Sequence, residues 1–267
     1  MTAAARPLPG ILRCAAFETA AAPGDGWQQE IPAPGVELVL ELDTRWEVEV
    51  GGRRFSTGAF VGGPAAARIR TRARGPMRLV QVSLHPLAVP ALLGVPAGEL
   101  ARQIVDLDAA LGDEATRLLE QLDDAWRSGG PSAAASAGAW IERRALRPMP
   151  SGHARPSAPP DLIRALARLE TTQQYLPTGT LATELGCSRR HLARRFEQWI
   201  GTTPTEHQRL RRLALATAAL REHPTAGLAG VAADAGYADQ SHMVRDFRAL
   251  TDRTPGATAR AFAVLAD

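Results

Sequence analysis

Leu181-Ala-Thr-Glu-Leu-Gly186 and Val231-Ala-Ala-Asp-Ala-Gly236 follow one pattern, an apolar residue and an alanine with a glycine four residues after the alanine. A second matching pair follows, Leu192-Ala-Arg-Arg-Phe196 in the first copy and Met243-Val-Arg-Asp-Phe247 in the second. An internal repeat indicates architecture before any single residue does. A short helix, a glycine turn and a second amphipathic helix predict two helix-turn-helix units in the last third of the chain.

The second helix of each unit is predicted to present arginine on the side that faces away from the core. Successive residues of an α-helix are about 100° apart, so Arg190 and Arg194 lie opposite Leu192. Arg245 lies opposite Met243 in the second copy. A helix that packs one side on its neighbour and leaves an arginine-bearing side free has the geometry of a recognition helix in a major groove. The alternative is that these arginines form ordinary solvated faces.

A set of residues on these helices is expected to contact DNA. Arginine can donate two hydrogen bonds to guanine, and glutamine pairs in the same way with adenine. Residues at a helix N-terminus, or beside the outward direction, are better placed for phosphate than for bases. The candidates for base contact are Arg190, Arg194 and Arg245, followed by Gln240, Ser241 and His242, and the candidates for backbone contact are Ser188, Arg189 and Arg195.

A proline-rich segment divides the chain. Residues 148–160 contain five prolines, which oppose both helix formation and sheet pairing and favour an extended spacer. We therefore expect a sensing or dimerisation domain over residues 1–147, a linker over residues 148–160 and a DNA-binding domain over residues 161–267.

The first domain is predicted to be rich in β-structure. Val36–Leu42 is a largely apolar run, and Trp46-Glu-Val-Glu-Val50 alternates before Gly51-Gly52, which indicates a hairpin. Strands are expected between residues 27 and 84, in a small barrel or sandwich. Helices are then expected near 87–93, 97–103, 113–127 and 132–147, and, after the linker, near 162–175, 180–185, 188–200, 205–221, 228–235, 240–250 and 256–264. The sequence thus predicts an α+β protein whose second domain is all helical.

Residues from about 161 to 265 resemble the DNA-binding domain of the AraC/XylS family of bacterial transcription regulators. The matching residues are Ala182, Gly186, Ser188, Leu192, Arg194, Phe196, Gly201 and Pro204 in the first copy, and Ala232, Gly236, Tyr237, Gln240, Ser241, Met243, Arg245, Phe247 and Pro255 in the second. The resemblance implies seven helices, two helix-turn-helix units joined by a long fourth helix, and insertion into successive major grooves of double-stranded DNA. Asp252 stands where the family usually has glycine, so we expect a distorted turn there.

The N-terminal region resembles the incomplete cupin-like barrel that precedes this domain in one branch of the family. The resemblance rests on Pro34–Leu40 and on Leu93–Ala97. It implies a module that senses a small-molecule effector, forms a homodimer, or does both. A regulator of this kind is expected to contact RNA polymerase.

Arg68-Ile-Arg-Thr-Arg-Ala-Arg74 places its arginines on one face of a predicted strand, because alternate residues of a strand share a face. Like charges on one face repel, so acidic neighbours, solvent or an anionic ligand must compensate them. We expect a solvated outer face. The alternative is an effector or anion site formed by Arg68, Arg70, Arg72 and Arg74.

No catalytic, metal or cofactor site is expected. His85 is the only histidine before the linker, whereas a cupin metal site needs several histidines and a carboxylate around one ion. We expect His85 to cap or pack near the end of its strand, and the histidines of the second domain, His207 among them, to lie on helix surfaces. Trp27 and Trp46 are expected to pack in the core, and the alternative is that they line a ligand cavity.

The composition agrees with a cytoplasmic protein that meets nucleic acid and not a membrane. The 267 residues carry a net charge of +3, and all 31 basic residues are arginine. No apolar run reaches the roughly 20 residues of a membrane-spanning helix, and Cys14 and Cys187 are too few for a disulfide framework. The rival hypotheses are an enzyme that uses the helical domain for targeting, which we do not expect, and a protein-interaction module. A steep dependence of DNA affinity on salt would argue against the second rival.

Overall fold

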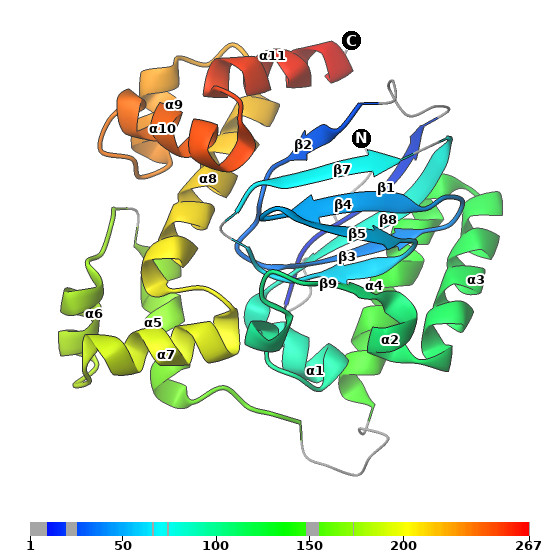
Figure 1. The fold of residues 1–267 in the computed structure, drawn as a ribbon, viewed down its shortest axis with the longest axis horizontal. Helices are drawn as coiled ribbons and strands as arrows, with labels where there is room; N and C mark the ends of the chain where they lie inside the picture. The colour runs from blue at the N-terminus through cyan, green and yellow to red at the C-terminus, as the bar shows by residue number, and fades with distance from the viewer. Residues whose placement is uncertain are drawn as a thin grey trace.

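The computed structural model describes residues 10–19, 26–65, 67–73, 75–147, 155–172 and 174–266. Figure 1 shows β-sheets flanked by helices in the N-terminal part, beside a helical region formed by the C-terminal part. The protein has an α+β fold, as the sequence predicts. Of the expected linker, residues 148–154 lie outside the described residues, and residues 155–159 are irregular up to the next helix.

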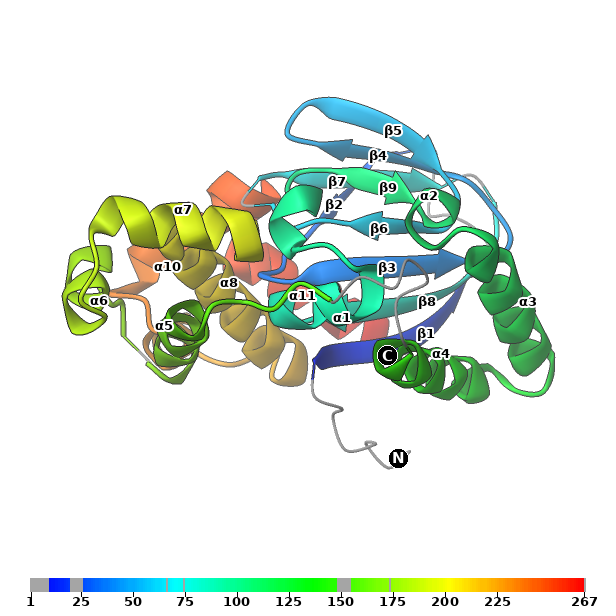
Figure 2. The same cartoon turned by 90° about the horizontal axis from the view of Figure 1, so that it is seen from below.

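Within the described residues, nine strands form two antiparallel sheets that face each other (Figures 1 and 2). The first sheet has the order β1-β8-β3-β6-β9 and the second has the order β2-β7-β4-β5. Val48 of β4 packs with Phe60 of β6, so the two sheets meet through apolar side chains. The strands are β1 Ile11–Thr19, β2 Gln28–Glu30, β3 Val36–Glu41, β4 Trp46–Val50, β5 Arg53–Thr57, β6 Phe60–Gly62, β7 Ile69–Ala73, β8 Met77–Leu84 and β9 Ile104–Asp106.

Strand β3 separates the two sides of the first sheet. Val36, Leu38 and Leu40 have no exposed surface and belong to the core that the helices share. Glu37 and Val39 lie between them, and alternate residues of a strand point to opposite faces. These two residues therefore face the second sheet, where they line a cavity.

The outer face of the first sheet is covered by helices. Leu118 and Leu122 of α3 and Ala133 and Ala137 of α4 are completely buried in the core that includes β3 and β8. Burial of one leucine side chain stabilises a fold by about 1.5–3 kcal/mol. The elements of this region are η1 Pro86–Ala88, α1 Val89–Leu93, η2 Ala97–Leu100, α2 Leu107–Leu111, α3 Asp113–Arg127 and α4 Gly130–Leu146.

Two features of this domain differ from the predictions. The helix expected over residues 97–103 is a short 3-10 helix, Ala97–Leu100, and β9 begins four residues after it at Ile104. Val105 of β9 pairs with Val61 of β6, so sheet pairing overrides the local helical preference of this segment. Strand β1 lies before the predicted start of the sheets and pairs with β8 along nearly all of its length.

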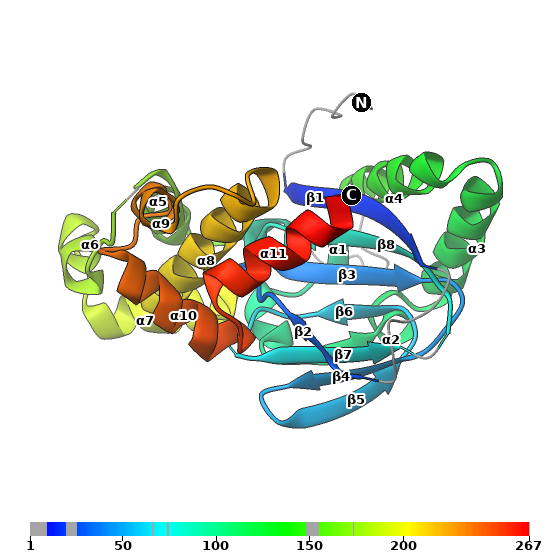
Figure 3. The ribbon, with the colours of Figure 1, turned by 90° about the horizontal axis from the view of Figure 1, so that it is seen from above.

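The described residues of the C-terminal part form seven helices, as the family resemblance implies. Helices α5, α6 and α7 enclose one apolar cluster around Phe196, and α8 to α11 enclose a second around Phe247. Helix α8 runs from the first group to the second (Figure 1), and α11 runs from the second group toward the β-sheets (Figure 3). The helices are α5 Pro160–Thr171, α6 Thr178–Glu184, α7 Arg189–Ile200, α8 Pro204–Glu222, α9 Leu228–Asp234, α10 Gln240–Thr251 and α11 Pro255–Ala266.

Helix α8 begins with a complete capping box. Thr203 Oγ1 accepts a hydrogen bond from the backbone N–H of Glu206 at 3.2 Å, and Glu206 Oε2 accepts one from the N–H of Thr203 at 2.9 Å. Because both groups of helices pack on α8, several of its polar residues are buried, including Gln208, Arg212 and Thr217. His207 is only 1% exposed, so the expectation that it lies on a helix surface is wrong.

The N-terminal domain contacts the helical domain through His85. The N–H of Leu87 donates to His85 Nδ1 at 3.2 Å, so His85 caps η1 as expected. Its Nε2 therefore carries the proton and lies 3.0 Å from Glu170 Oε1 of α5, which is also 3.7 Å from His207 Nε2. Burial alone would raise the pKa of Glu170, but its contacts with His207 and His85 lower that pKa to about 2. Glu170 is thus an ionised group shared by both domains.

The two domains also pack directly against each other where η2 meets α7. A Cβ added at Gly98 would lie 2.2 Å from the carbonyl oxygens of both Glu197 and Gln198. Only glycine permits this approach of the two backbones. The C-terminal end of α7 is therefore held against the N-terminal domain.

Candidate nucleic-acid interface and interdomain cavity

The first helix-turn-helix unit consists of α6 and α7. Gly186 makes the turn between them with φ of 65°, in the left-handed region that glycine adopts without penalty. Ser188 Oγ then accepts a hydrogen bond from the N–H of His191 at 3.1 Å and caps α7. Leu192 and Phe196 are buried in the cluster that joins α5 and α6. The packing side of α7 is the side predicted from its apolar residues.

The outer side of α7 carries exposed arginines. Arg189, Arg190 and Arg194 are exposed, and none of them forms an ion pair with a carboxylate in the described part of the chain. Arg195 differs, because its side chain is only 29% exposed and its Nη1 lies 3.5 Å from Asp161 Oδ1 of α5. Arg195 Nε also donates to His191 Nε2 at 3.1 Å, which holds this guanidinium beside α5.

The second unit, α9 and α10, repeats this arrangement. Met243 and Phe247 are completely buried against α8 and α9. Gln240, Ser241 and Arg245 are exposed, and Arg245 has no ion pair among the residues that the structure describes. The outward direction predicted for α10 therefore agrees with the structure.

His242 is turned partly toward the protein. Asp239 Oδ1 accepts a hydrogen bond from the N–H of His242 at 2.6 Å, which caps α10. The His242 ring packs edge-on against Tyr237 with centroids 5.2 Å apart, and its side chain is 33% exposed. Its ring is thus positioned at the turn of the unit, beside the exposed face of α10.

A buried ionic network ties α10 to α8, and sequence reasoning missed it. Arg209 Nε donates to Asp246 Oδ1 at 2.8 Å, and the buried Arg212 lies 4.0 Å from Asp246 Oδ2 and stacks over Tyr237 at 5.4 Å. Burial raises the pKa of Tyr237, with a further contribution from the charge of Asp246. The sequence contains a pattern that predicts this burial, because Asp246 stands three residues after Met243 and therefore on the buried side of the helix.

The turn at Asp252 is regular, so the predicted distortion is wrong. Asp252 has φ of 57°, close to the φ of 84° at Gly201 in the equivalent turn of the first unit. An aspartate adopts this left-handed conformation at a cost of roughly 1–2 kcal/mol. Its carboxylate lies 3.3 Å from Arg68 of the N-terminal domain. Arg68 also donates to the carbonyl of Ala249 at 3.2 Å and to that of Arg248 at 3.3 Å, at the C-terminal end of α10.

Comparisons with known proteins agree with this architecture. The structure of ToxT from Vibrio cholerae superposes with a TM-score of 0.56 at 9% identity, over 93% of this chain and 97% of that one. ToxT bound to (E)-4-(8-methylnaphthalen-1-yl)but-3-enoic acid gives 0.56 at 9% identity, over 94% and 98%. ToxT bound to an unsaturated fatty acid gives 0.52 at 8% identity, over 96% and 97%. At these identities the similarity concerns the fold. No curated protein sequence matches the chain.

Residues 181–261 match the helix-turn-helix domain family, and this range spans both units with exposed arginines. This match and the ToxT-like fold support the assignment of the chain to the AraC/XylS family of regulators. It is a DNA-binding transcription regulator.

The arginines of β7 in this regulator face acidic neighbours on β4. Arg70 Nη1 lies 3.7 Å from Glu49 Oε1, and Arg72 pairs with Glu47. Both guanidiniums also stack over Trp27 at 5.1 Å. Arg68 points to α10 instead, and Arg74 lies outside the described residues.

A cavity of about 410 Å³ lies between the two sheets of the regulator and α8. Its apolar wall includes Val39, Val48, Phe60 and Ile69 from the sheets and Ala214 and Ala218 from α8. Trp46, which was expected to pack in the core, lines this cavity as well. Its charged lining residues are Arg13 and Arg221, from β1 and α8, and Glu30 and Glu37, from β2 and β3. Both domains thus contribute to one mostly apolar space of the size that small ligands occupy.

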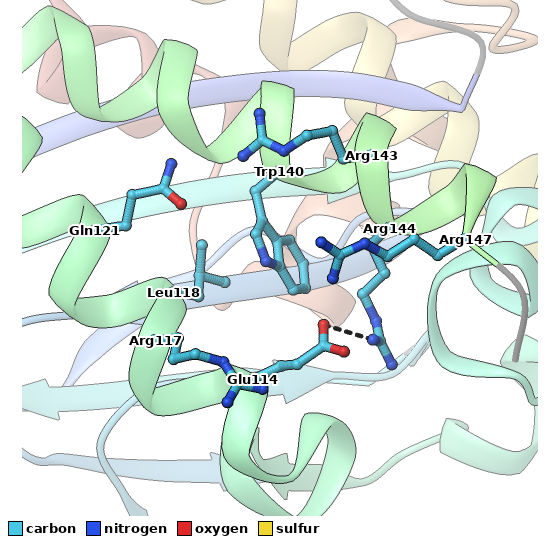
Figure 4. A pocket seen from close by; sticks show the side chains of 8 residues that line it. All are labelled: Glu114, Arg117, Leu118, Gln121, Trp140, Arg143, Arg144 and Arg147. Atoms are coloured by element: carbon cyan, nitrogen blue, oxygen red, sulfur yellow. Dashed lines mark ion pairs between the residues drawn. The ribbon is translucent and has the colours of Figure 1, made fainter. Parts of the chain in front are cut away.

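A second, smaller pocket of about 180 Å³ lies between α3 and α4 (Figure 4). Arg144 Nη1 lies 2.6 Å from Glu114 Oε2 across the pocket, and Arg144 Nε donates to the carbonyl of Leu92 at 3.0 Å. This pair joins the two helices. The pocket lies on the side of the molecule away from the helix-turn-helix units (Figure 1).

No group of three or more histidine, cysteine, aspartate or glutamate side chains in the described ranges could hold a metal ion. No helix in the part of the chain that the structure describes has the length and apolar character needed to cross a bilayer.

Proposed function

We propose that α7 and α10, the recognition helices, enter successive major grooves of one duplex, about one turn or roughly 34 Å apart. The observation that carries this proposal is the pair of matched outer faces, on which Arg190, Arg194 and Arg245 are exposed without carboxylate partners among the described residues. These three arginines read bases, with Gln240 and Ser241 beside them.

The remaining candidates position the helices on the sugar-phosphate backbone. Ser188 lies at the N-terminus of α7, where the helix dipole favours a phosphate, and Arg189 is exposed next to it. His242 occupies the corresponding turn of α10. Arg195 is paired with Asp161 and therefore reaches a phosphate only by exchanging that partner.

The experiment is a titration of fragments selected from genomic DNA by the purified protein. We expect Arg194→Ala and Arg245→Ala each to weaken the best fragment by about 1–3 kcal/mol and to relax its sequence preference. Arg189→Ala is expected to weaken all fragments equally and to reduce the salt dependence of binding. Arg117→Ala, at an exposed site on α3, is the matched control. Equal affinities of the Arg194 and Arg245 variants and the wild type would refute this docking.

We also propose that the interdomain cavity binds an apolar carboxylic acid as effector. The two ToxT ligands named above are of this chemical kind. Burial and the nearby charge of Arg13 both lower the pKa of Arg221, so an anion between these arginines would relieve a repulsion. Since β1 and α8 belong to different domains, such a ligand would connect the sensing and DNA-binding parts. Weaker binding of dodecanoic acid to Arg221→Gln than to the wild type, measured by titration calorimetry, would test the assignment.

We further propose a role for each part of the chain and a setting for the whole protein. Residues 1–147 and 161–267 act as a sensing domain and a DNA-binding domain joined by the linker at 148–160. The regulator works in the cytoplasm, as a homodimer that meets RNA polymerase on DNA and catalyses no reaction. Sedimentation with and without a selected fragment tests the dimer.

A further inference from the structure

The cavity between the sheets and α8 carries two carboxylates in addition to its apolar wall and its arginines. Glu30 Oε1 accepts a hydrogen bond from Thr71 at 2.6 Å. Glu37 Oε2 accepts hydrogen bonds from Gln81 at 3.0 Å and from Ser83 at 2.9 Å. The side chains of both glutamates are thus fixed by neighbours on the sheets.

Each carboxylate uses only one of its oxygens in these contacts. Among the described residues, Glu30 Oε2 and Glu37 Oε1 have no hydrogen-bond donor, and both residues line the cavity. Burial raises the pKa of both carboxyl groups, which shows that their surroundings solvate the charge poorly. An acceptor that loses its water without gaining a donor costs about 1–3 kcal/mol.

A purely apolar chain that filled this cavity would impose that cost. A ligand that donates a hydrogen bond to one of these oxygens avoids it, and sites built around such a bond discriminate strongly against analogues that lack the donor. The hydrogen-bond donor on the ligand can be uncharged, because arginines already offset part of the negative charge of the glutamates. Arg13 interacts electrostatically with both glutamates, and Arg253 interacts with Glu30.

We propose that the effector is a hydroxylated apolar carboxylic acid. Its carboxylate lies at Arg13 and Arg221, its chain lies along the apolar wall, and its hydroxyl donates to Glu37 or Glu30. This inference rests on the proposed effector cavity and narrows its ligand from acids in general to acids that carry a donor on the chain.

The test compares dodecanoic acid with 3-hydroxydodecanoic and 12-hydroxydodecanoic acids by calorimetry on the full chain. The change in tryptophan fluorescence, to which Trp46 in the cavity contributes, is a second readout. We expect at least one hydroxylated acid to bind about tenfold or more tightly than dodecanoic acid. Glu37→Met and Glu30→Met remove one acceptor each. The substitution at the glutamate that accepts from the ligand hydroxyl is expected to abolish the preference for the hydroxylated acid, while the variant still binds dodecanoic acid. Glu120→Gln, at an exposed site on α3, is the matched control.

The outcomes separate the two proposals. Equal binding of all three acids by the wild type would overturn the hydroxyl inference and leave the effector cavity standing. Binding of none of them would overturn the effector cavity itself. The comparison on the wild type decides both points even if a methionine variant fails to fold.

Discussion

Substitution of Gly98 by alanine is expected to separate the N-terminal domain from the first recognition helix. The new Cβ would lie 2.2 Å from the carbonyl oxygens of Glu197 and Gln198, whereas ordinary contact begins at 3.4 Å. The two backbones must therefore move apart by about 1.2 Å. Both carbonyls belong to α7, so a side-chain rotation cannot relieve the clash and the helix must shift as a unit. Overpacking of this kind costs about 1–3 kcal/mol.

Two measurements check this prediction. Urea denaturation is expected to show the loss of stability, and hydrogen exchange is expected to rise at η2 and at the C-terminal end of α7. Gly138→Ala is the matched control, because Gly138 lies inside α4 with open space around its Cα. Alanine is the better helix former by roughly 0.5–1 kcal/mol, so this control should be stabilised. If Gly98→Ala unfolds like the wild type and exchanges at the same rate, the close packing of η2 on α7 does not hold the domains together.

Three further perturbations follow from the structure. Asp252→Gly should raise the free energy of unfolding by up to about 1 kcal/mol in urea denaturation, because it removes left-handed strain and the exposed pair with Arg68 contributes little; a clear loss would contradict this. Thr217→Val should stabilise the fold by about 1 kcal/mol in the same assay, since Thr217 Oγ1 is buried without a hydrogen-bond partner in the described residues, and destabilisation would show that the hydroxyl is satisfied in solution. The lowered pKa of Glu170 contributes stability above about pH 4.5 that is lost as the pH falls through about 2. The difference in unfolding free energy between the wild type and Glu170→Gln should therefore shrink over that pH range. A constant difference would argue against ionised Glu170 as the cause.

The outer faces of α7 and α10 could be predicted from the sequence, but the contacts of the helical domain with the N-terminal domain could not. The apolar spacing of Leu192 and Phe196 fixes which side packs, so it also fixes that Arg194 is exposed. The spacing of apolar residues in one helix does not predict which other elements or domains pack on that helix. For this reason the burial of His207 and the contact of Gly98 with α7 appear only in the assembled fold.

The short strands show the same limit. Ile104–Asp106 has three residues, and its strand conformation comes from its pairing with β6. Asp252 shows a different limit, since a family pattern predicts glycine where a left-handed φ is needed but does not say that aspartate can supply it. Asn and Asp are the residues that tolerate this conformation best after glycine.

In the proposed mechanism, three contacts between the domains connect the effector cavity to the DNA-binding helices. The N-terminal domain meets α7 at Gly98 and the end of α10 at Arg68, and it shares the cavity with α8 between them. The proposed docking in successive grooves requires one relative position of α7 and α10. In this structure that position depends on α8 and also on the contacts of the N-terminal domain with α7 and α10. A ligand that changes the distance between the sheets and α8 therefore changes the position of both recognition helices at once. Such a coupling requires that the ligand binds the two domain arrangements with different affinity. A ligand with equal affinity for both arrangements does not shift the equilibrium between them.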